Sequence, residues 1–274
     1  MTVTPDDYLF VRRLVQDASA IDLSDGREYL VAARLSPIAR REGLGTVGEL
    51  VTRLRRGSPA LCDDVVEAMA TKETSFFRDV HPFDALRDHM VPELLAAGPR
   101  RLSIWSAAAA TGQEAYSVAM LMLDHFASAP APAILATDLS RQALEVAREG
   151  RYTGLEVNRG LPARLLVRHF DRDGTGWVVK PAVRRLVDFR RMNLSEPWPA
   201  LPRMDVVLLR NVLIYFDAAA KARVLDRAAG VLRPGGYLML GSAETTYGID
   251  DRYERVGLGR SLCYRLRTGN GEAS

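Results

Sequence analysis

The stretch 206–216 reads VVLLRNVLIYF, which is apolar almost throughout but carries Arg210 and Asn211 in its middle. Residues 205–209 have the length and the valine and leucine content of a buried strand. A buried strand tolerates an arginine and an amide poorly, unless something at its end needs them. In open α/β sheets, ligands bind beyond the carboxyl ends of the strands. The stretch therefore favours a strand that delivers two polar side chains to a binding site. The alternative is that Arg210 pairs with a carboxylate for structure.

Strands and helices alternate on both sides of this stretch. Short apolar segments predict strands, and longer segments with helical spacing predict helices. From residue 101 onwards, the expected strands are 101–106, 133–138, 205–209, 237–241 and 261–266, and the expected helices are 111–126, 141–149 and 218–232. This alternation predicts an α/β fold, a doubly wound parallel sheet with helices on both faces. Residues 170–194 interrupt the alternation with a glycine-containing turn, which predicts an inserted antiparallel hairpin.

The first 70 residues show only helical patterns. Helices are expected over 8–15, 28–41 and 46–56, so the sequence predicts a small all-α N-terminal domain, 1–72, ahead of a larger domain, 73–274. Residues 27–56 hold seven arginines against three glutamates. This excess of positive charge indicates either a solvated helix face or a surface for an acidic partner.

Composition excludes several classes of protein. Of the 274 residues, 47% are hydrophobic and 26% charged, as in ordinary globular proteins. The net charge of +3, without a run of basic residues, argues against a nucleic-acid partner. Two cysteines are too few for a disulfide framework or a zinc cluster, and we expect no metal. The chain shows no signal pattern and no apolar run of about 20 residues, so we expect a cytoplasmic protein without membrane insertion.

Polar residues follow the first two expected strands as well. The first strand runs into AAAATGQEAYS (107–117), whose small residues let the backbone approach a ligand closely. It is neither a phosphate-binding P-loop nor a dinucleotide fingerprint. From the residues alone, Glu114 fits best as the end of a capping box that begins at Thr111. Asp138 ends the second strand. Its carboxylate could accept hydrogen bonds from the hydroxyls of a ribose, or Asp138 or Ser140 could merely cap the next helix.

The sequence holds no set of residues for covalent or histidine-based catalysis. There is no Gly-x-Ser-x-Gly elbow and no His-Glu-x-x-His motif. The four histidines lie in dissimilar segments. A nucleoside-binding fold without an evident acid or base suggests the transfer of a group from an activated cofactor.

Several motifs together resemble the chemotaxis receptor methyltransferase (CheR) family. The more specific ones are TSFFRD and RNVLIYFD, and all occur in the family's order. The matching stretches are ATKETSFFRD (70–79), IWSAAAATGQEAYSVAM (104–120), ATDLSRQALEVAREGRY (136–152), RRMNL (190–194), LLRNVLIYFD (208–217) and LRPGGYLMLGSAET (232–245). The resemblance implies an enzyme that moves a methyl group from S-adenosylmethionine to receptor glutamates, leaving S-adenosylhomocysteine. It implies a helical N-terminal domain before a Rossmann-like class I methyltransferase domain, which carries a small β-subdomain at about 165–192.

The resemblance also assigns roles to individual residues. Arg78 and Tyr215 would act at the transferred methyl group. The cofactor would be bound by Thr74, Arg78, Glu114, Asp138 (at the ribose), Asn193 and Leu194 (at the adenine), Arg210 and Asn211. Lys72 stands where the family most often has asparagine, so we assign it no cofactor contact. The implied partners are the cytoplasmic helices of chemoreceptors, and nothing in the sequence demands more than a monomer.

The chemistry implied by the resemblance suits the absence of a base. A glutamate has a reference pKa of about 4.3, so its carboxylate is already the nucleophile at neutral pH. Two other readings remain open. One is a non-catalytic regulator that binds S-adenosylmethionine, and the other is a methyltransferase for another protein, a nucleic acid or a small molecule. The Asn/Asp-Pro-Pro-aromatic loop of enzymes that methylate DNA amino groups is missing.

Overall fold

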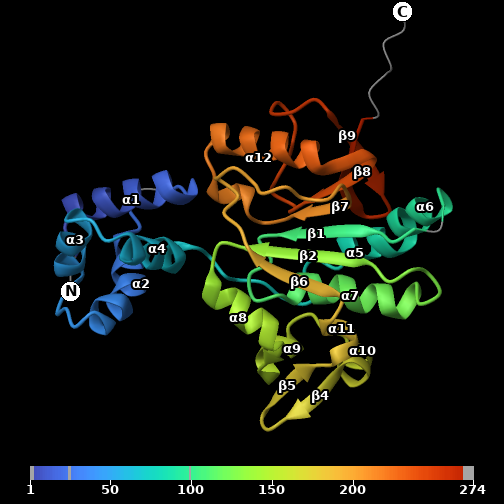
Figure 1. Cartoon of the computed structure of the whole chain (residues 1–274), viewed down its shortest axis with the longest axis horizontal. Coiled ribbons are helices and arrows are strands. Elements are labelled where there is room, and N and C mark those ends of the chain that lie inside the picture. The colour runs from blue at the N-terminus through green and yellow to red at the C-terminus, as the bar shows by residue number, and fades with distance from the viewer. Residues whose placement is uncertain (1–2, 24–25, 99, 268–274) are drawn as a thin grey trace, which may run out of the picture.

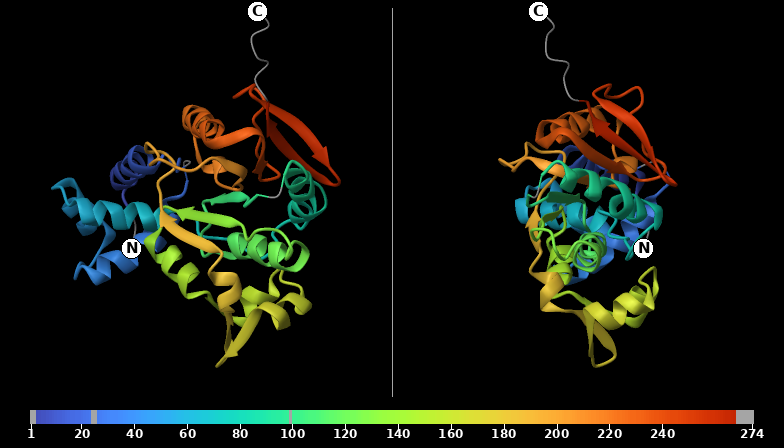
Figure 2. Two further views of the ribbon diagram at one scale, coloured as in Figure 1. Left: turned by 45° about the vertical axis from the view of Figure 1, so that its right-hand side comes forward. Right: turned by 90° about the vertical axis from the view of Figure 1, so that its right-hand side faces the viewer.

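The computed structural model describes residues 3–23, 26–98 and 100–267. Figure 1 shows three parts: a group of helices at the N-terminal end, a central sheet with helices on both faces, and a small sheet below it. The two further views in Figure 2 show that the small sheet projects away from the central one. None of the helices in the described part of the chain could cross a membrane.

Four helices make the N-terminal part: α1 Pro5–Ser19, α2 Glu28–Arg41, α3 Val47–Arg55 and α4 Pro59–Met69. The side chains of Thr4 and Thr46 cap α1 and α3 by accepting backbone N–H groups. Apolar residues at helical spacing face inward and form one core. The predicted all-α character is confirmed, and α4 is a helix that the sequence had not singled out.

The central sheet has seven strands in the order β6-β2-β1-β7-β8-β10-β9. Their bounds are β1 Ser103–Ala107, β2 Ala133–Asp138, β6 Val187–Arg191, β7 Met204–Leu209, β8 Leu232–Leu240, β9 Tyr253–Leu258 and β10 Ser261–Leu266. The first five strands of that order run parallel. The parallel prediction is wrong for β10, which runs antiparallel to β8 and to the unpredicted strand β9. A two-residue turn joins β9 to β10, and such a short connection permits only antiparallel pairing.

Helices cover both faces of the central sheet. Those before β2 are α5 His81–Ala85, the π-helix η1 Leu86–Met90, α6 Val91–Ala96 and α7 Gln113–His125; those after it are α8 Arg141–Glu149, the 3-10 helix η2 Leu213–Tyr215 and α12 Ala218–Val231. In β7, Val206 and Leu208 belong to the core shared with α7 and α8, whereas Val207 and Leu209 belong to the core shared with α12. Burial on both faces explains why this strand is apolar at every position.

The small sheet has the order β3-β5-β4, with β3 Arg151–Tyr152, β4 Phe170–Asp173 and β5 Gly176–Val179. Three short helices accompany it: α9 Gly154–Asn158, α10 Ala163–His169 and α11 Pro181–Arg184. The hairpin predicted over 170–194 is therefore confirmed for β4 and β5 only. Residues 187–191 form β6, which pairs in parallel with β2 at the edge of the central sheet. The buried side chain of Phe189 anchors β6 to the central core.

Candidate active site

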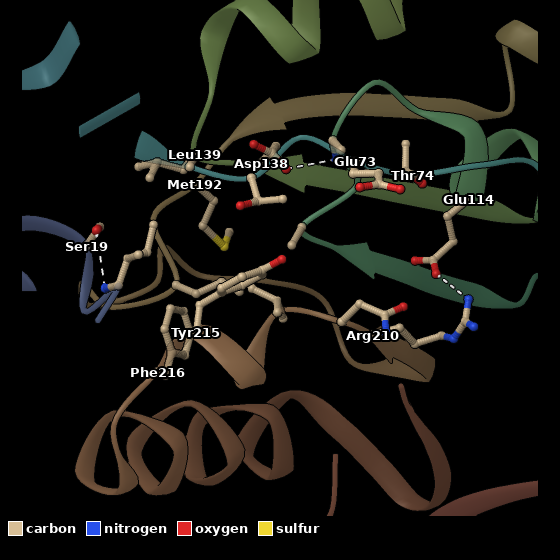
Figure 3. A pocket seen from close by; sticks show the side chains of 18 of the residues that line it. Ser19, Glu73, Thr74, Glu114, Asp138, Leu139, Met192, Arg210, Tyr215 and Phe216 are labelled. Carbon is tan, nitrogen blue, oxygen red and sulfur yellow. Dashed lines mark hydrogen bonds and ion pairs between the residues drawn. The ribbon is translucent and has the colours of Figure 1, made fainter. Parts of the chain in front are cut away.

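One cavity lies where β1, β2 and β7 end and the N-terminal helices approach the sheet (Figure 3). All nine residues that the sequence singled out line it: Thr74, Arg78, Glu114, Asp138, Asn193, Leu194, Arg210, Asn211 and Tyr215. They come from segments far apart in the chain, and they meet because parallel strands end at one edge of the sheet. Their individual roles stay predictions.

The loop between β1 and α7 forms one wall of the cavity. Ala108 and Ala110 have the left-handed backbone angles φ 68° and φ 49°, which are uncommon for residues other than glycine. Gly112 follows at φ 95°, and a Cβ there would lie 2.9 Å from the Cβ of Ala147 on α8. A larger residue would thus push α8 away from the loop. Small residues are needed here for backbone curvature and close packing.

Asp138 is held at the end of β2 by two backbone groups. Its Oδ1 accepts the N–H of Ser140 and its Oδ2 accepts the N–H of Ala110, both at 2.8 Å. Burial raises the pKa of Asp138, against the opposing effect of these two N–H groups and of Lys72. Ser140 caps α8 by accepting the N–H of Ala143, so Asp138 does not serve as the helix cap. Each carboxylate oxygen keeps a lone pair for a ligand hydroxyl.

Glu114 does not form the capping box that its sequence context favoured. The N-cap of α7 is Gly112, and no side chain caps the helix. Glu114 is instead buried, with Oε1 accepting the hydroxyl of Ser106 at 2.8 Å and Oε2 accepting Nη1 of Arg210 at 2.9 Å. The capping interpretation is therefore wrong, because a charged partner from β7 competes with the local backbone.

Arg210 donates through both of its Nη atoms, whereas its buried Nε has no hydrogen-bond partner among the described residues. Besides Glu114, it donates to the carboxylate of Asp79 at 2.7 Å and to the carbonyl of Arg78 at 3.0 Å. Its side chain is 1% exposed, against 11% for Glu114 and 44% for Asp79. The structural reading of Arg210 is therefore correct. The residue lines the cavity and also ties the 78–79 turn to the end of β7.

Glu244, which the sequence had not marked as a site residue, fixes the position of Asn211. Asn211 has φ 58°, and its N–H donates to Glu244 Oε2 at 2.7 Å. The N–H groups of Ile214 and Gly241 donate to the same carboxylate. A Cβ at Gly241 would lie 2.6 Å from the side-chain nitrogen of Asn211. The available signal was that Glu244 closely follows the end of β8, at the edge where ligands bind.

The polar groups of Arg78 and Tyr215 make few contacts with the rest of the protein. Within the described ranges, the guanidinium of Arg78 has no carboxylate at ion-pair distance, and its one hydrogen bond, to the carbonyl of Glu73, is long at 3.4 Å. No described residue hydrogen-bonds to the hydroxyl of Tyr215. In Figure 3, Asp138, Glu73 and Thr74 lie along one side of the cavity and Tyr215 along the other.

The remaining end of the cavity is mostly apolar and is closed by the N-terminal helices. Met192 and Leu194 line it beside Ile21, which forms a β-bridge with Phe216. Asn193 donates its side-chain amide to the carbonyl of Ala18 at 2.7 Å, so its amide nitrogen serves the contact between domains. Sequence reasoning missed the lining residues before the second domain, namely Ser19, Ile21, Ala70 and Thr71.

Glu67 of α4 joins the N-terminal helices to the start of α8. Its Oε1 accepts both the hydroxyl of Ser140 and the N–H of Gln142, each at 2.8 Å. Burial alone would raise the pKa of Glu67, but these donors outweigh it and hold the pKa below its usual value. Lys72 donates to the side chain of Gln142 at 3.2 Å and does not line the cavity.

Phe76 and Phe77 lie beside the cavity rather than in its lining. Phe76 is fully buried, with its ring 5.0 Å from that of Tyr152 and 5.6 Å from that of Phe170 in the small sheet. Phe77 packs against Phe83. The pair therefore anchors the TSFFRD segment to the one core that the central sheet and the small sheet share.

The arrangement suits S-adenosylmethionine and offers little for acid–base chemistry. Carboxylates are available for a ribose, apolar side chains for an adenine, and small residues for close backbone approach. Among the residues that the structure describes, no histidine, cysteine or lysine lines the cavity. Among the described residues, no group of three or more potential metal ligands is clustered.

Family models match both parts of the chain. The model for the CheR methyltransferase, SAM binding domain matches residues 72–261, and that for the CheR methyltransferase, all-alpha domain matches residues 6–70. The chain belongs to the CheR methyltransferase family. It therefore carries an S-adenosylmethionine-binding methyltransferase domain behind an all-α domain.

Relatives extend over nearly the whole chain. Chemotaxis protein methyltransferase 1 of Pseudomonas aeruginosa is 40% identical, over 97% of this chain and all of its own. Chemotaxis protein methyltransferase Cher2 of Pseudomonas putida is 39% identical, over 95% of this chain and 98% of its own. Among solved structures, the glycopeptide N-methyltransferase MtfA with S-adenosylmethionine has 16% identity and a TM-score of 0.35, over 54% of this chain and 47% of its own. That likeness is too weak to add to the CheR assignment.

Proposed function

We propose that this CheR-family protein methylates glutamate side chains in the cytoplasmic helices of chemoreceptors. The observation that carries the proposal is the state of the charged groups in the cavity. Arg78 lacks an ion-pair partner among the described residues. Of the three carboxylates in the lining, Glu114 is paired with Arg210 and Glu73 with Arg159, whereas Asp138 accepts two backbone N–H groups and keeps lone pairs for a hydroxyl. Such a cavity attracts a carboxylate and has no evident base to deprotonate a neutral nucleophile. The names of the two Pseudomonas relatives support the same reading.

The reaction needs alignment more than proton transfer. Bound S-adenosylmethionine supplies a methyl group on a sulfonium. One oxygen of the substrate glutamate would form a bond to the methyl carbon as the carbon–sulfur bond breaks, with the electron pair left on sulfur. Arg78 would hold the second oxygen and Tyr215 would donate a hydrogen bond. Orientation of this kind can contribute about 7–11 kcal/mol.

The cofactor roles follow the layout of the cavity. We propose that Asp138 binds the ribose and that Asn193 and Leu194 flank the adenine. Thr74, Glu114 and Asn211 would lie nearer the methionine portion. Arg210 would act through Glu114, because its guanidinium is already engaged.

The arginines of the N-terminal helices are only partly available to a partner. Arg41, Arg53 and Arg55 form ion pairs within the domain. Arg34 donates to the carbonyl of Met69 at 2.6 Å. The others are exposed and have no carboxylate at ion-pair distance in the described part of the chain: Arg27, Arg40 and Arg56. We propose that these exposed arginines attract the acidic face of a receptor helix.

Methyl transfer to a receptor tests the proposal directly. The full-length protein is incubated with methyl-labelled S-adenosylmethionine and the cytoplasmic fragment of a chemoreceptor from the same organism. We expect label on the fragment that mild alkali releases as methanol, as a carboxyl ester requires. Label that resists alkali would refute glutamate esterification. No label on the fragment, from a protein that still binds S-adenosylhomocysteine, would favour a regulator or another protein substrate.

A further inference from the structure

A second cavity lies beside the active site. It is formed by the 79–82 turn, the end of β8 and the turn between β9 and β10, and Arg210 lines both cavities. Its volume is about 240 Å³.

The second cavity is lined by one cation, Arg260, that has no carboxylate partner among the described residues. Its two acidic residues, Asp79 and Glu244, are occupied by Arg210 and by backbone N–H groups respectively. Arg260 is exposed in the two-residue turn between β9 and β10, and no described carboxylate lies within ion-pair distance of it. His81 has Asp84 at 3.7 Å. The formal charges of the lining cancel, but the exposed guanidinium of Arg260 is left without a carboxylate partner among the described residues and can take an anionic group.

Three exposed apolar side chains line the second cavity or are next in sequence to residues that line one of the two cavities. Val80 is 55% exposed in the turn that follows Arg78. Leu262 is 39% exposed in the lining of the second cavity, and Ile214 is 45% exposed next to Tyr215. Exposed apolar residues next to an uncompensated arginine fit a helix that presents both apolar and acidic side chains.

The two cavities are adjacent, because Arg210 lines both. Residues three or four apart on a helix are neighbours, with about 5–6 Å between their Cβ atoms. Two side chains from adjacent turns of one helix could therefore enter the two cavities together.

We propose that the second cavity is a substrate subsite, in which Arg260 binds an acidic side chain one helical turn from the glutamate that is methylated. This inference rests on the proposed function. It makes the protein prefer target glutamates that have an acidic neighbour three or four positions away. The neighbour would lose its attraction to Arg260 once it is itself esterified.

Charge reversal at Arg260 tests the subsite. The full-length Arg260→Glu variant is compared with Arg255→Glu, whose exposed arginine lies on the same hairpin outside the cavity. We expect Arg260→Glu to raise KM for the receptor fragment about tenfold, as an attraction between exposed charges becomes a repulsion. The kcat and the Kd for S-adenosylhomocysteine should stay as in the wild type. An equal rise in KM for both variants would overturn the proposal, because general electrostatics would then explain it.

A compensating change in the receptor identifies the partner. In the fragment, the acidic residue three or four positions from the methylated glutamate is replaced by lysine. We expect a higher KM with the wild type and a recovery with Arg260→Glu. Recovery at no position would refute the subsite, although methylation of the fragment by the wild type would leave the proposed function standing. A fragment that the wild type leaves unlabelled would refute the proposed function and the subsite with it.

Discussion

Replacement of Arg210 by methionine isolates the ion pair at the end of β7. Methionine keeps an apolar side chain in the space but removes the charge that faces Glu114. The side chain of Glu114 is 11% exposed and would keep the hydroxyl of Ser106 as its side-chain donor. A buried charge that loses its partner in this way costs about 3–5 kcal/mol of unfolding free energy.

The loss should appear as a lower unfolding temperature. For a domain of 150–250 residues, about 2–4 °C of Tm corresponds to each kcal/mol, so we expect Arg210→Met to lower Tm by about 6–20 °C. The matched control is Asp79→Asn, which breaks the other ion pair of Arg210. Asp79 is 44% exposed, and such pairs contribute at most about 1 kcal/mol. The double variant Glu114→Gln with Arg210→Met removes both buried charges and should recover much of the loss.

The assay is scanning calorimetry of the full-length variants without cofactor, at neutral pH and fixed protein concentration. Titration with S-adenosylhomocysteine then tests whether the 78–79 turn stays in place for binding. The reasoning is wrong if Arg210→Met lowers Tm no further than Asp79→Asn does. It is also wrong if the double variant loses as much stability as Arg210→Met and Glu114→Gln, measured separately, lose in sum.

Three further predictions concern the cavity and the partner. Arg78→Ala should lose most methyl transfer with an unchanged Tm, because no ion pair is broken; activity near that of the wild type would contradict its role. Because burial raises the pKa of Asp138, affinity for S-adenosylhomocysteine should fall on acidification at a higher pH than for an ordinary aspartate. Titration calorimetry of the Asp138→Asn variant should show a lower affinity that changes less with pH. KM for the receptor fragment should rise with salt, and a KM independent of salt would exclude charge-based docking.

Local patterns were sufficient for most of the architecture. The alternation of apolar runs and helical segments predicted the order of the main elements, because burial on a sheet or a helix imposes its own period. Polar residues at the ends of strands predicted the site, since parallel strands bring those ends together. For this reason Asp138 and the pair Arg210-Asn211 could be found without a structure.

Pairings between distant segments could not be found in this way. The capping motif at Glu114 was a valid local pattern, but Arg210, 96 positions away, binds the carboxylate instead. Likewise, 187–191 has the alternation of a hairpin strand, and only the free edge of β2 decides that it joins the central sheet.

The sequence by itself determined the class of fold, the edge of the sheet that carries the cavity and nine of the twenty residues that line it. Tertiary structure alone decided that Ser19 and Thr71 close the cavity, that Glu244 holds Asn211, and that Arg260 stands beside a second cavity. The physical reason is that periodicity reports which face of an element is buried. It does not report which distant side chain meets that face, and partners in space set the hydrogen bonds and charges of a site.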